Sequence, residues 1–263
     1  MNKILDIKSK DNSIYKQTKK LLMKKNRDQT GQYLIEGNNL LKEAIDNGVS
    51  ILGIFLKDDY ETKNSEFLST EQTLESIPTY RLDGRLFDDL SDTTTSQGII
   101  GIVKKTEAKP FPNKGNIVVL DRLQDPGNIG TIIRTAEAAG YVGVAILKGS
   151  GDVYSSKVVR GAAGSLFRMP LFFFDTREEF LESKTASGRK LVATSLKAER
   201  YYYEEDIIRD IALIIGNEGA GIDPLLEEKC DVSIKIPMKG NMDSLNVAVA
   251  AGILMYESVR SKE

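Results

Sequence analysis

The sequence predicts an α/β protein of two domains, the second built on a parallel sheet with helices on both faces. After residue 115, short and almost continuously apolar runs alternate with helical patterns, which is typical of parallel strands that are buried on both sides. Before it, residues 104–115 contain two prolines and no periodic apolar face, which indicates a linker. We therefore expect one domain at 1–105, a linker at 106–114 and a second domain at 115–263.

The first domain is predicted to be a small α/β domain. Its amphipathic patterns predict helices at 12–25, 39–47 and 83–90, and strands at 33–35, 51–56, 79–82 and 99–103. The second domain is predicted to have strands at 116–120, 142–147, 172–174, 190–194, 212–215 and 233–236. Its helices are predicted at 129–139, 155–163, 177–183, 223–228 and 245–260. The three phenylalanines at 172–174 favour a buried strand.

Composition excludes several kinds of chemistry. The chain has no histidine and one cysteine, so imidazole catalysis, His-based zinc sites and intramolecular disulfides are excluded. Cys230 is expected to be a small residue packed after a helix. We expect no metal. No apolar run approaches the length that a bilayer requires, and the lysine-rich start lacks a signal-peptide pattern, so a cytoplasmic protein with no membrane partner is expected.

Charge is unevenly distributed along the chain. The overall net charge is −2, yet residues 1–28 carry a local net charge of +6. Such a cluster can neutralise phosphates, although a solvated helix face gives the same pattern. The candidate RNA contacts here are Lys19, Lys20, Lys24, Lys25 and Arg27.

Three loops rich in glycine and amide residues follow predicted strands. Residues 121–134 contain Gly127 and Gly130 and lead into a helix that carries Arg134. By spacing alone this is an ordinary turn between strand and helix, and it lacks the glycine pattern of a dinucleotide site. Residues 216–221 place three glycines around Asn217 and Glu218.

The third loop, residues 236–246, ends a strand and precedes the last helix. Ser244 is predicted to cap that helix, and Asn246 follows in its first turn. Because ligands of parallel sheets bind at the carboxyl ends of the strands, the three loops predict one site for a polar, partly adenine-like ligand.

These stretches resemble the motifs of the SpoU (TrmH) family of RNA ribose 2′-O-methyltransferases, in the SPOUT superfamily. The run NIGTIIRTA at 128–136 resembles the first motif, and IGNEG at 215–219 resembles the second. The third is matched by IPM at 236–238 with SLNVA at 244–248, in the expected order. Residues 13–105 are similar to the L30e-like substrate-binding domain that often precedes this catalytic domain.

The resemblance implies a deep trefoil knot, a homodimer and S-adenosylmethionine as cofactor. The implied cofactor-binding backbone groups belong to Thr194, Gly216, Ile236, Met238 and Leu245. Arg134 takes the activating role in the family. Since arginine is effectively always protonated, we expect Arg134 to orient the ribose hydroxyl and stabilise developing alkoxide charge. The other implied catalytic residues are Asn128, Glu218, Ser244 and Asn246, with Glu218 an alternative proton acceptor.

The sequence therefore predicts methyl transfer from S-adenosylmethionine to a ribose 2′-hydroxyl of structured RNA, with 23S rRNA as the preferred substrate. A tRNA methyltransferase, a non-catalytic RNA-binding ribosome-assembly factor and a nicotinamide-dependent oxidoreductase are the alternatives. Arg122 and Arg160 are further candidate phosphate ligands. The three tyrosines at 201–203 favour a packed surface turn, with base stacking as the alternative.

Overall fold

The predicted parallel sheet is confirmed in the computed structural model, which describes residues 4–60, 76–106, 110, 113–183 and 188–260. The chain divides into two compact units. Unit 1 comprises Met1–Glu107 with Tyr154–Phe167, and unit 2 comprises Ala108–Val153 with Arg168–Glu263. Residues 107–109 and 111–112 of the predicted linker lie outside the described residues.

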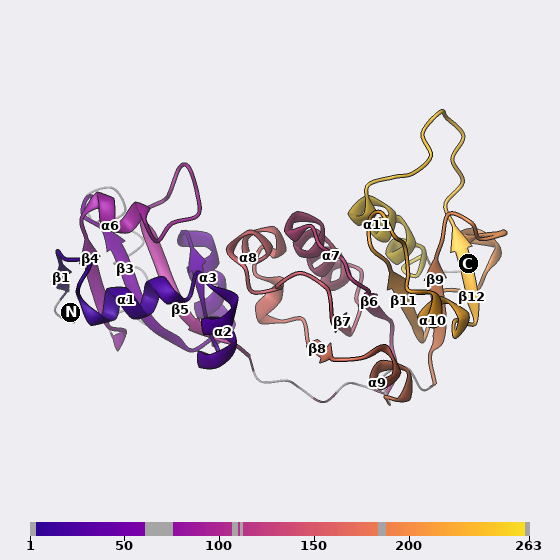
Figure 1. Ribbon diagram of the computed structural model, residues 1–263, viewed down its shortest axis with the longest axis horizontal. Helices are drawn as coiled ribbons and strands as arrows, with labels where there is room; N and C mark the ends of the chain where they lie inside the picture. Colours follow the sequence, from indigo (N-terminus) through magenta and orange to yellow (C-terminus); the bar gives the residue numbers. More distant parts are fainter. Residues whose placement is uncertain (1–3, 61–75, 107–109, 111–112, 184–187, 261–263) are drawn as a thin grey trace. The chain divides into compact units, whose positions relative to one another are not determined.

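Unit 2 contains a sheet whose seven described strands run parallel to one another, in the order β10-β12-β9-β11-β6-β7-β8 (Figure 1). The strands are β6 (Ile117–Leu120), β7 (Gly143–Leu147), β8 (Leu171–Phe174), β9 (Lys190–Thr194), β10 (Arg200–Tyr201), β11 (Ile211–Ile215) and β12 (Val232–Lys235). From β6 the chain builds the sheet outward through β7 and β8, and it then returns to build the other side beginning with β9. The strand order therefore reverses between β6 and β11, which is where ligands bind in sheets of this kind.

Helices cover both faces of this sheet. On one face α9 (Arg177–Glu182) and α10 (Pro224–Glu228) pack through Phe180 and Leu226 against Ile117 and Val119 of β6. On the other, α7 (Pro126–Ala138) and α11 (Val247–Glu257) pack against each other (Figure 1). Every residue of β6 is fully buried, as expected for a central strand with apolar side chains on both sides.

Several predicted boundaries in unit 2 are wrong. Helix α7 begins at Pro126 instead of 129, because the Asp125 carboxylate caps it by accepting a hydrogen bond from the Asn128 N–H at 2.8 Å. Helix α11 begins at Val247, and its cap is Asn246 instead of Ser244. The predicted buried strand at 172–174 is the edge strand β8, so Phe173 is 56% exposed.

Unit 1 holds a mixed sheet whose described strands have the order β1-β4-β3-β5-β2. Its strands are β1 (Leu5–Ile7), β2 (Gln32–Glu36), β3 (Ile51–Lys57), β4 (Thr79–Leu82) and β5 (Ile99–Lys104). Its helices include α1 (Ser13–Lys20), α2 (Lys24–Thr30), α3 (Asn38–Asp46) and α6 (Gly84–Asp88). The predicted single helix at 12–25 is wrong: the chain turns at 21–23, where the Arg27 guanidinium donates to the Leu21 carbonyl at 2.6 Å.

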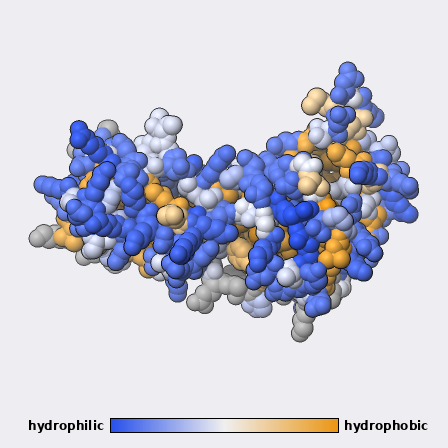
Figure 2. Space-filling model, in the orientation of Figure 1, coloured by the Kyte–Doolittle hydropathy of each residue, from blue (hydrophilic) through white to orange (hydrophobic). Residues whose placement is uncertain are grey.

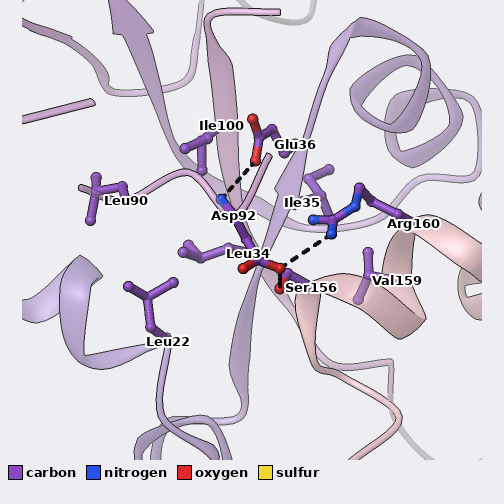
Figure 3. Close-up of a pocket in the computed structure, with 10 residues that line it drawn as sticks. All are labelled: Leu22, Leu34, Ile35, Glu36, Leu90, Asp92, Ile100, Ser156, Val159 and Arg160. Atoms are coloured by element: carbon purple, nitrogen blue, oxygen red, sulfur yellow. Dashed lines mark hydrogen bonds and ion pairs between the residues drawn. The ribbon is translucent and has the colours of Figure 1, made fainter. Parts of the chain in front are cut away.

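Helix α8 (Ser156–Ala162) and the short 3₁₀ helix η2 (Ser165–Phe167) belong to unit 1, where α8 packs against β2. Figure 3 shows the polar contacts that hold α8 there. The Asp92 carboxylate accepts hydrogen bonds from the Ser156 hydroxyl at 2.5 Å and from Arg160 at 3.2 Å. The Glu36 carboxylate accepts from the hydroxyls of Ser91 and Thr93, which fixes the loop that carries Asp92. A cavity of about 20 Å³ among these groups has room for one water.

Candidate active site

The three loops predicted from the sequence all follow carboxyl ends of the parallel strands in unit 2. Thr194, Gly216 and Ile236 end or follow the neighbouring strands β9, β11 and β12. Residues 121–125 follow β6, which lies next to β11. The loops therefore meet at one edge of the sheet, beside the reversal of strand order.

The loop at 216–221 is a closed turn that depends on glycine. Asn217 and Gly221 bond to each other through their backbones, and the Asn217 side-chain oxygen accepts from the N–H groups of Gly219 and Ala220. A Cβ atom at Gly216 would lie 2.4 Å from the backbone carbon of Gly221. A larger residue at 216 would therefore displace the turn and the Glu218 that it presents.

Three predicted catalytic residues form one chain of hydrogen bonds. The Glu218 carboxylate accepts from the Asn128 side-chain amide at 3.3 Å and from the Asp125 N–H at 3.3 Å. The Asn128 oxygen accepts from the Asn246 side-chain amide at 3.0 Å. The site therefore joins the first turns of α7 and α11 to the loop after β11.

Both ends of this chain fix its direction. At one end, the Asn246 oxygen accepts from the N–H groups of Ala248 and Val249, so its NH₂ group must face Asn128. At the other end, a Glu218 carboxylate oxygen accepts from the Asn128 NH₂ group, which therefore faces Glu218. The orientation of each side-chain amide is thus set by its neighbours.

Arg134 and Ser244 lie outside this chain of hydrogen bonds. Arg134 is exposed on α7 and makes no ion pair or hydrogen bond with any described residue. Six residues separate it from Asn128, which turns it about 240° around the helix axis. Ser244 is exposed in the loop 236–246, which stands out from unit 2 between β12 and α11 in Figure 1.

A buried ionic cluster behind the loops was missed by sequence reasoning. The Asp121 carboxylate is fully buried and accepts from Arg177 at 2.8 Å, from Arg122 at 3.3 Å and from the Asp223 N–H at 2.7 Å. The Arg122 carbonyl accepts from the Asn217 side chain at 3.0 Å. The cluster therefore ties the loop after β6 to the loop after β11, although its members are far apart in sequence.

The predicted cofactor positions have unused backbone groups. Within the described residues, the backbone N–H and C=O groups of Ile236, Met238 and Leu245 make no hydrogen bond. Ile236 and Met238 are half-buried and Leu245 is exposed, so their free backbone donors and acceptors can bind a ligand with ring nitrogens and hydroxyls. The chemistry of these donors and acceptors therefore fits an adenosine group.

The predicted RNA contacts in unit 1 divide into exposed and engaged side chains. Lys20, Lys24 and Lys25 are exposed and make no ion pair with a described residue. Lys19 pairs with Asp89. Arg27 needs correction as an RNA contact, because it is 7% exposed and closes the turn between α1 and α2.

The predicted phosphate ligands Arg122 and Arg160 are both paired with carboxylates. Arg122 lies between Asp121 and Asp223, and its backbone has a φ of 57°. Arg160 pairs with Asp92 at 3.2 Å. Both side chains are still about a third exposed, at 31% and 32%, so their roles as phosphate ligands stay predictions.

The described residues contain neither a cluster of metal ligands nor a membrane-spanning helix. Among them there is no group of three or more Cys, Asp or Glu side chains placed to hold a metal ion. None of the described helices combines the length and the apolar character that crossing a membrane requires.

Known proteins resemble the chain over nearly all of its length. The SpoU rRNA Methylase family matches residues 115–256, and the MRM3-like substrate binding domain matches residues 12–101. A 23S rRNA guanosine 2′-O-methyltransferase of Bacillus subtilis, RlmP, is 38% identical over 250 residues, which cover 95% of this chain and 97% of that protein.

Two solved structures share the fold. The AdoMet-bound rRNA methyltransferase of Sinorhizobium meliloti superposes with a TM-score of 0.83 at 31% identity, covering 97% of both chains. The SpoU methyltransferase AviRb of Streptomyces viridochromogenes, in complex with AdoMet, gives a TM-score of 0.83 at 28% identity, covering 94% of this chain and 97% of that one. The chain belongs to the SpoU rRNA methylase family.

Proposed function

We propose that this protein transfers a methyl group from S-adenosylmethionine to a ribose 2′-hydroxyl of 23S ribosomal RNA. The observation that carries the proposal is the directed chain of hydrogen bonds from Asn246 through Asn128 to Glu218, placed at the reversal of strand order. The names of the relatives support the reaction and the ribosomal substrate.

The proposed cofactor site uses backbone groups at the positions implied by the family. Thr194, Gly216 and Ile236 lie at the ends of adjacent strands, and Met238 and Leu245 lie in the loop that follows β12. When bound there, S-adenosylmethionine supplies an activated methyl group on its sulfonium. The closed turn at 216–221 uses the N–H groups of Asn217, Gly219, Ala220 and Gly221 internally, which leaves the Gly216 backbone and the loop 236–246 for the ligand.

The chain's own residues must hold the ribose and ease the loss of the hydroxyl proton. We assign the Glu218 carboxylate as the proton acceptor, and Asn128 keeps one of its oxygens oriented. We assign Asn246 and Ser244 to positioning the nucleotide. We assign Arg134 to the hydroxyl and its neighbouring phosphate, where its fixed positive charge stabilises developing alkoxide.

A homodimer would complete this site. Helix α11 exposes an apolar stripe formed by Val249, Ile253 and Tyr256, which are 53%, 36% and 51% exposed. Figure 2 shows apolar surface over α11, at the foot of the loop 236–246. Residues spaced by three and four lie on one helix face, and large apolar faces of this kind favour a protein partner. Because Arg134 is exposed on the adjoining α7, we propose that a second copy covers the stripe and brings Arg134 to the site.

The remaining family properties are also part of the proposal. We propose a trefoil-knotted connection through β12 and α11, a cytoplasmic location, and an RNA-binding role for the domain at 1–105. Lys20, Lys24 and Lys25 are its exposed candidates for phosphate contact.

The test is methyl transfer from labelled S-adenosylmethionine to unmodified 23S rRNA and to tRNA transcripts. We expect incorporation into 23S rRNA that protects one phosphodiester bond from alkaline cleavage, and its loss in Arg134→Ala. Arg209→Ala is the matched control, because Arg209 is exposed just before β11, on the side of the sheet where the strands begin. Incorporation into tRNA alone would contradict the assignment of 23S rRNA as the substrate and would favour a tRNA methyltransferase. Cofactor binding without transfer to rRNA, tRNA or ribosomal particles would contradict the enzyme assignment and favour an assembly factor.

A further inference from the structure

The three tyrosines at 201–203 lie at the outer edge of the sheet in unit 2, at the carboxyl end of β10. Strand β10 runs parallel to β12, and Tyr201 is paired in register with Lys235. The short 3₁₀ helix η3 (Tyr202–Glu204) follows directly. Because β10 is parallel to the other strands, the tyrosines lie on the side of the sheet where the strands end, as do the loops of the candidate active site.

Their rings form a stacked cluster. The rings of Tyr201 and Tyr203 are nearly parallel, with an angle of 17° and centroids 5.5 Å apart. The Tyr202 ring meets Tyr203 edge-on at 5.2 Å, and the Lys235 ammonium lies 5.2 Å from the centre of the Tyr201 ring. Tyr203 is 50% exposed although Tyr201 stacks against it, so half of this side chain remains open to solvent.

Unpaired lysines belong to the segments that carry this cluster. Lys235 lies over the Tyr201 ring, Lys197 and Lys239 are close in sequence to Tyr201 and Lys235, and none of the three makes an ion pair with a described residue. Among the carboxylates of the same segment, Glu205 is engaged by Lys190 and Arg200, Glu204 accepts a hydrogen bond from the Tyr201 N–H, and Glu199 and Asp206 are exposed. Exposed aromatic rings beside unpaired lysines are typical of surfaces that bind unpaired nucleotides.

We infer that Tyr203, supported by Tyr201 and Lys235, is a stacking platform for an unpaired base of the RNA substrate. Four strand spacings separate β10 from β6, or about 19 Å. The platform therefore takes a base that flanks the methylated nucleotide, and it contributes to RNA binding without touching the reacting ribose. This inference rests on the proposed function, since it requires an RNA substrate.

Steady-state methylation of a 23S rRNA fragment tests it. We expect Tyr203→Ala to raise the KM for RNA about fivefold or more with little change in kcat, because a stacked base contributes to binding. Tyr203→Phe keeps the ring and should stay close to wild type. Phe173→Ala is the matched control, because Phe173 is similarly exposed on the opposite edge strand β8 and should leave the KM unchanged.

A fluorescence measurement tests the stacking without methyl transfer. The chain has no tryptophan, so Tyr203→Trp creates a single reporter. We expect its emission to be quenched on addition of the RNA fragment, and the emission of a Phe173→Trp variant to be unaffected. An unchanged KM in Tyr203→Ala together with no quenching would overturn the inference while leaving the proposed function intact. Quenching of the Tyr203→Trp variant by the RNA fragment, together with a wild type that never methylates that RNA, would instead overturn the proposed function. A change of oligomeric state in Tyr203→Ala would assign the cluster to a protein interface and also overturn the inference.

Discussion

Asn246 donates a hydrogen bond to the Asn128 side-chain oxygen at 3.0 Å, although 118 residues separate the two in sequence. Asn246 also caps α11 with its own oxygen. One amide group thus starts a helix and orients a predicted catalytic side chain, and these two roles can be separated by substitution.

Asn246→Asp should keep the helix cap but lose the donor to Asn128, because a carboxylate only accepts hydrogen bonds. We expect stability close to wild type and a kcat lowered about tenfold or more, since small displacements of positioned groups are costly. Asn246→Ala should lose both functions and cost ~1 kcal/mol of stability as well. Urea unfolding and single-turnover methylation measure the two effects. Full activity in Asn246→Asp would show that the hydrogen bond to Asn128 is dispensable.

Arg177→Ala should destabilise the protein by ~3 kcal/mol, because it leaves the buried Asp121 carboxylate with less compensating charge. We expect the low end of the range for buried pairs, since Arg122 and the Asp223 N–H still contact Asp121. Denaturant unfolding measures the change in free energy. Arg209→Ala, an exposed arginine, should stay within ~0.5 kcal/mol. Equal stability of the two variants would mean that the Asp121 cluster does not stabilise the loops.

Asp92 should contribute to stability at neutral pH and lose its contribution in acid. The Ser156 hydroxyl and then the Arg160 guanidinium hold the pKa of Asp92 below its usual range. A carboxyl with a lowered pKa in the folded state stabilises the protein above its unfolded pKa, and this effect disappears as pH falls through the folded pKa. We therefore expect wild type to exceed Asp92→Asn by at most ~1 kcal/mol near pH 7, because Asp92 is half exposed, and the gap to close below pH ~4.

Unfolding free energies at a series of pH values provide this measurement. Asp243→Asn is the control, because Asp243 is exposed in the loop 236–246 and has no ion pair with a described residue. A gap between wild type and Asp92→Asn that stays constant down to the acid limit would contradict the contacts in Figure 3.

Cys230 should react slowly with thiol reagents in the folded protein. Burial, with smaller contributions from Asp231 and Glu227, raises the pKa of its thiol to about 12. Since the thiolate is the reactive form, we expect labelling at pH 8 to be at least ~100-fold slower in the native state than in denaturant. The rate of disulfide exchange with an aromatic disulfide reagent measures both states. Similar rates would show that the thiol is open to solvent.

Ile253→Glu should break the proposed dimer, because it places a charge in the middle of the apolar stripe on α11. Sedimentation should show a dimer for wild type and a monomer for the variant, with methyl transfer lost in parallel. Phe173→Glu, an equally radical change on an exposed edge strand, should keep the dimer. A monomeric wild type with full activity would rule out a site completed by a second copy.

Much of the fold could be predicted because the strands of unit 2 are short apolar runs between helical patterns. Few folds other than a parallel sheet covered by helices contain that alternation. The failures have local physical causes. Residues 21–23 contain no glycine or proline, so nothing in the sequence marks the turn that Arg27 closes from six residues away. Phe173 belongs to an apolar run, yet an edge strand leaves it exposed.

The site was predictable to the extent that its residues follow strands. Asn128, Glu218 and Asn246 lie in or just after loops that a parallel sheet brings together at the carboxyl ends of its strands. The sequence also marks the start of α7, because Asp125 is a typical helix cap and Pro126 a typical first helical residue. The ion pair between Asp121 and Arg177 could not be predicted, because the two residues are 56 positions apart and neither belongs to a motif.

The assignment of α8 to unit 1 bears on how such proteins can exchange substrate domains. The chain leaves unit 1 after Glu107, re-enters it at Tyr154 and leaves again after Phe167. A recombination event at the linker alone would replace Asp92 and Glu36 while retaining Ser156 and Arg160 of α8. A transplanted first domain therefore needs a matching acid in the loop after α6. A protein that acquires a new RNA target with a new first domain must therefore keep the contacts of that domain to α8, a helix that lies within the methylase part of the sequence.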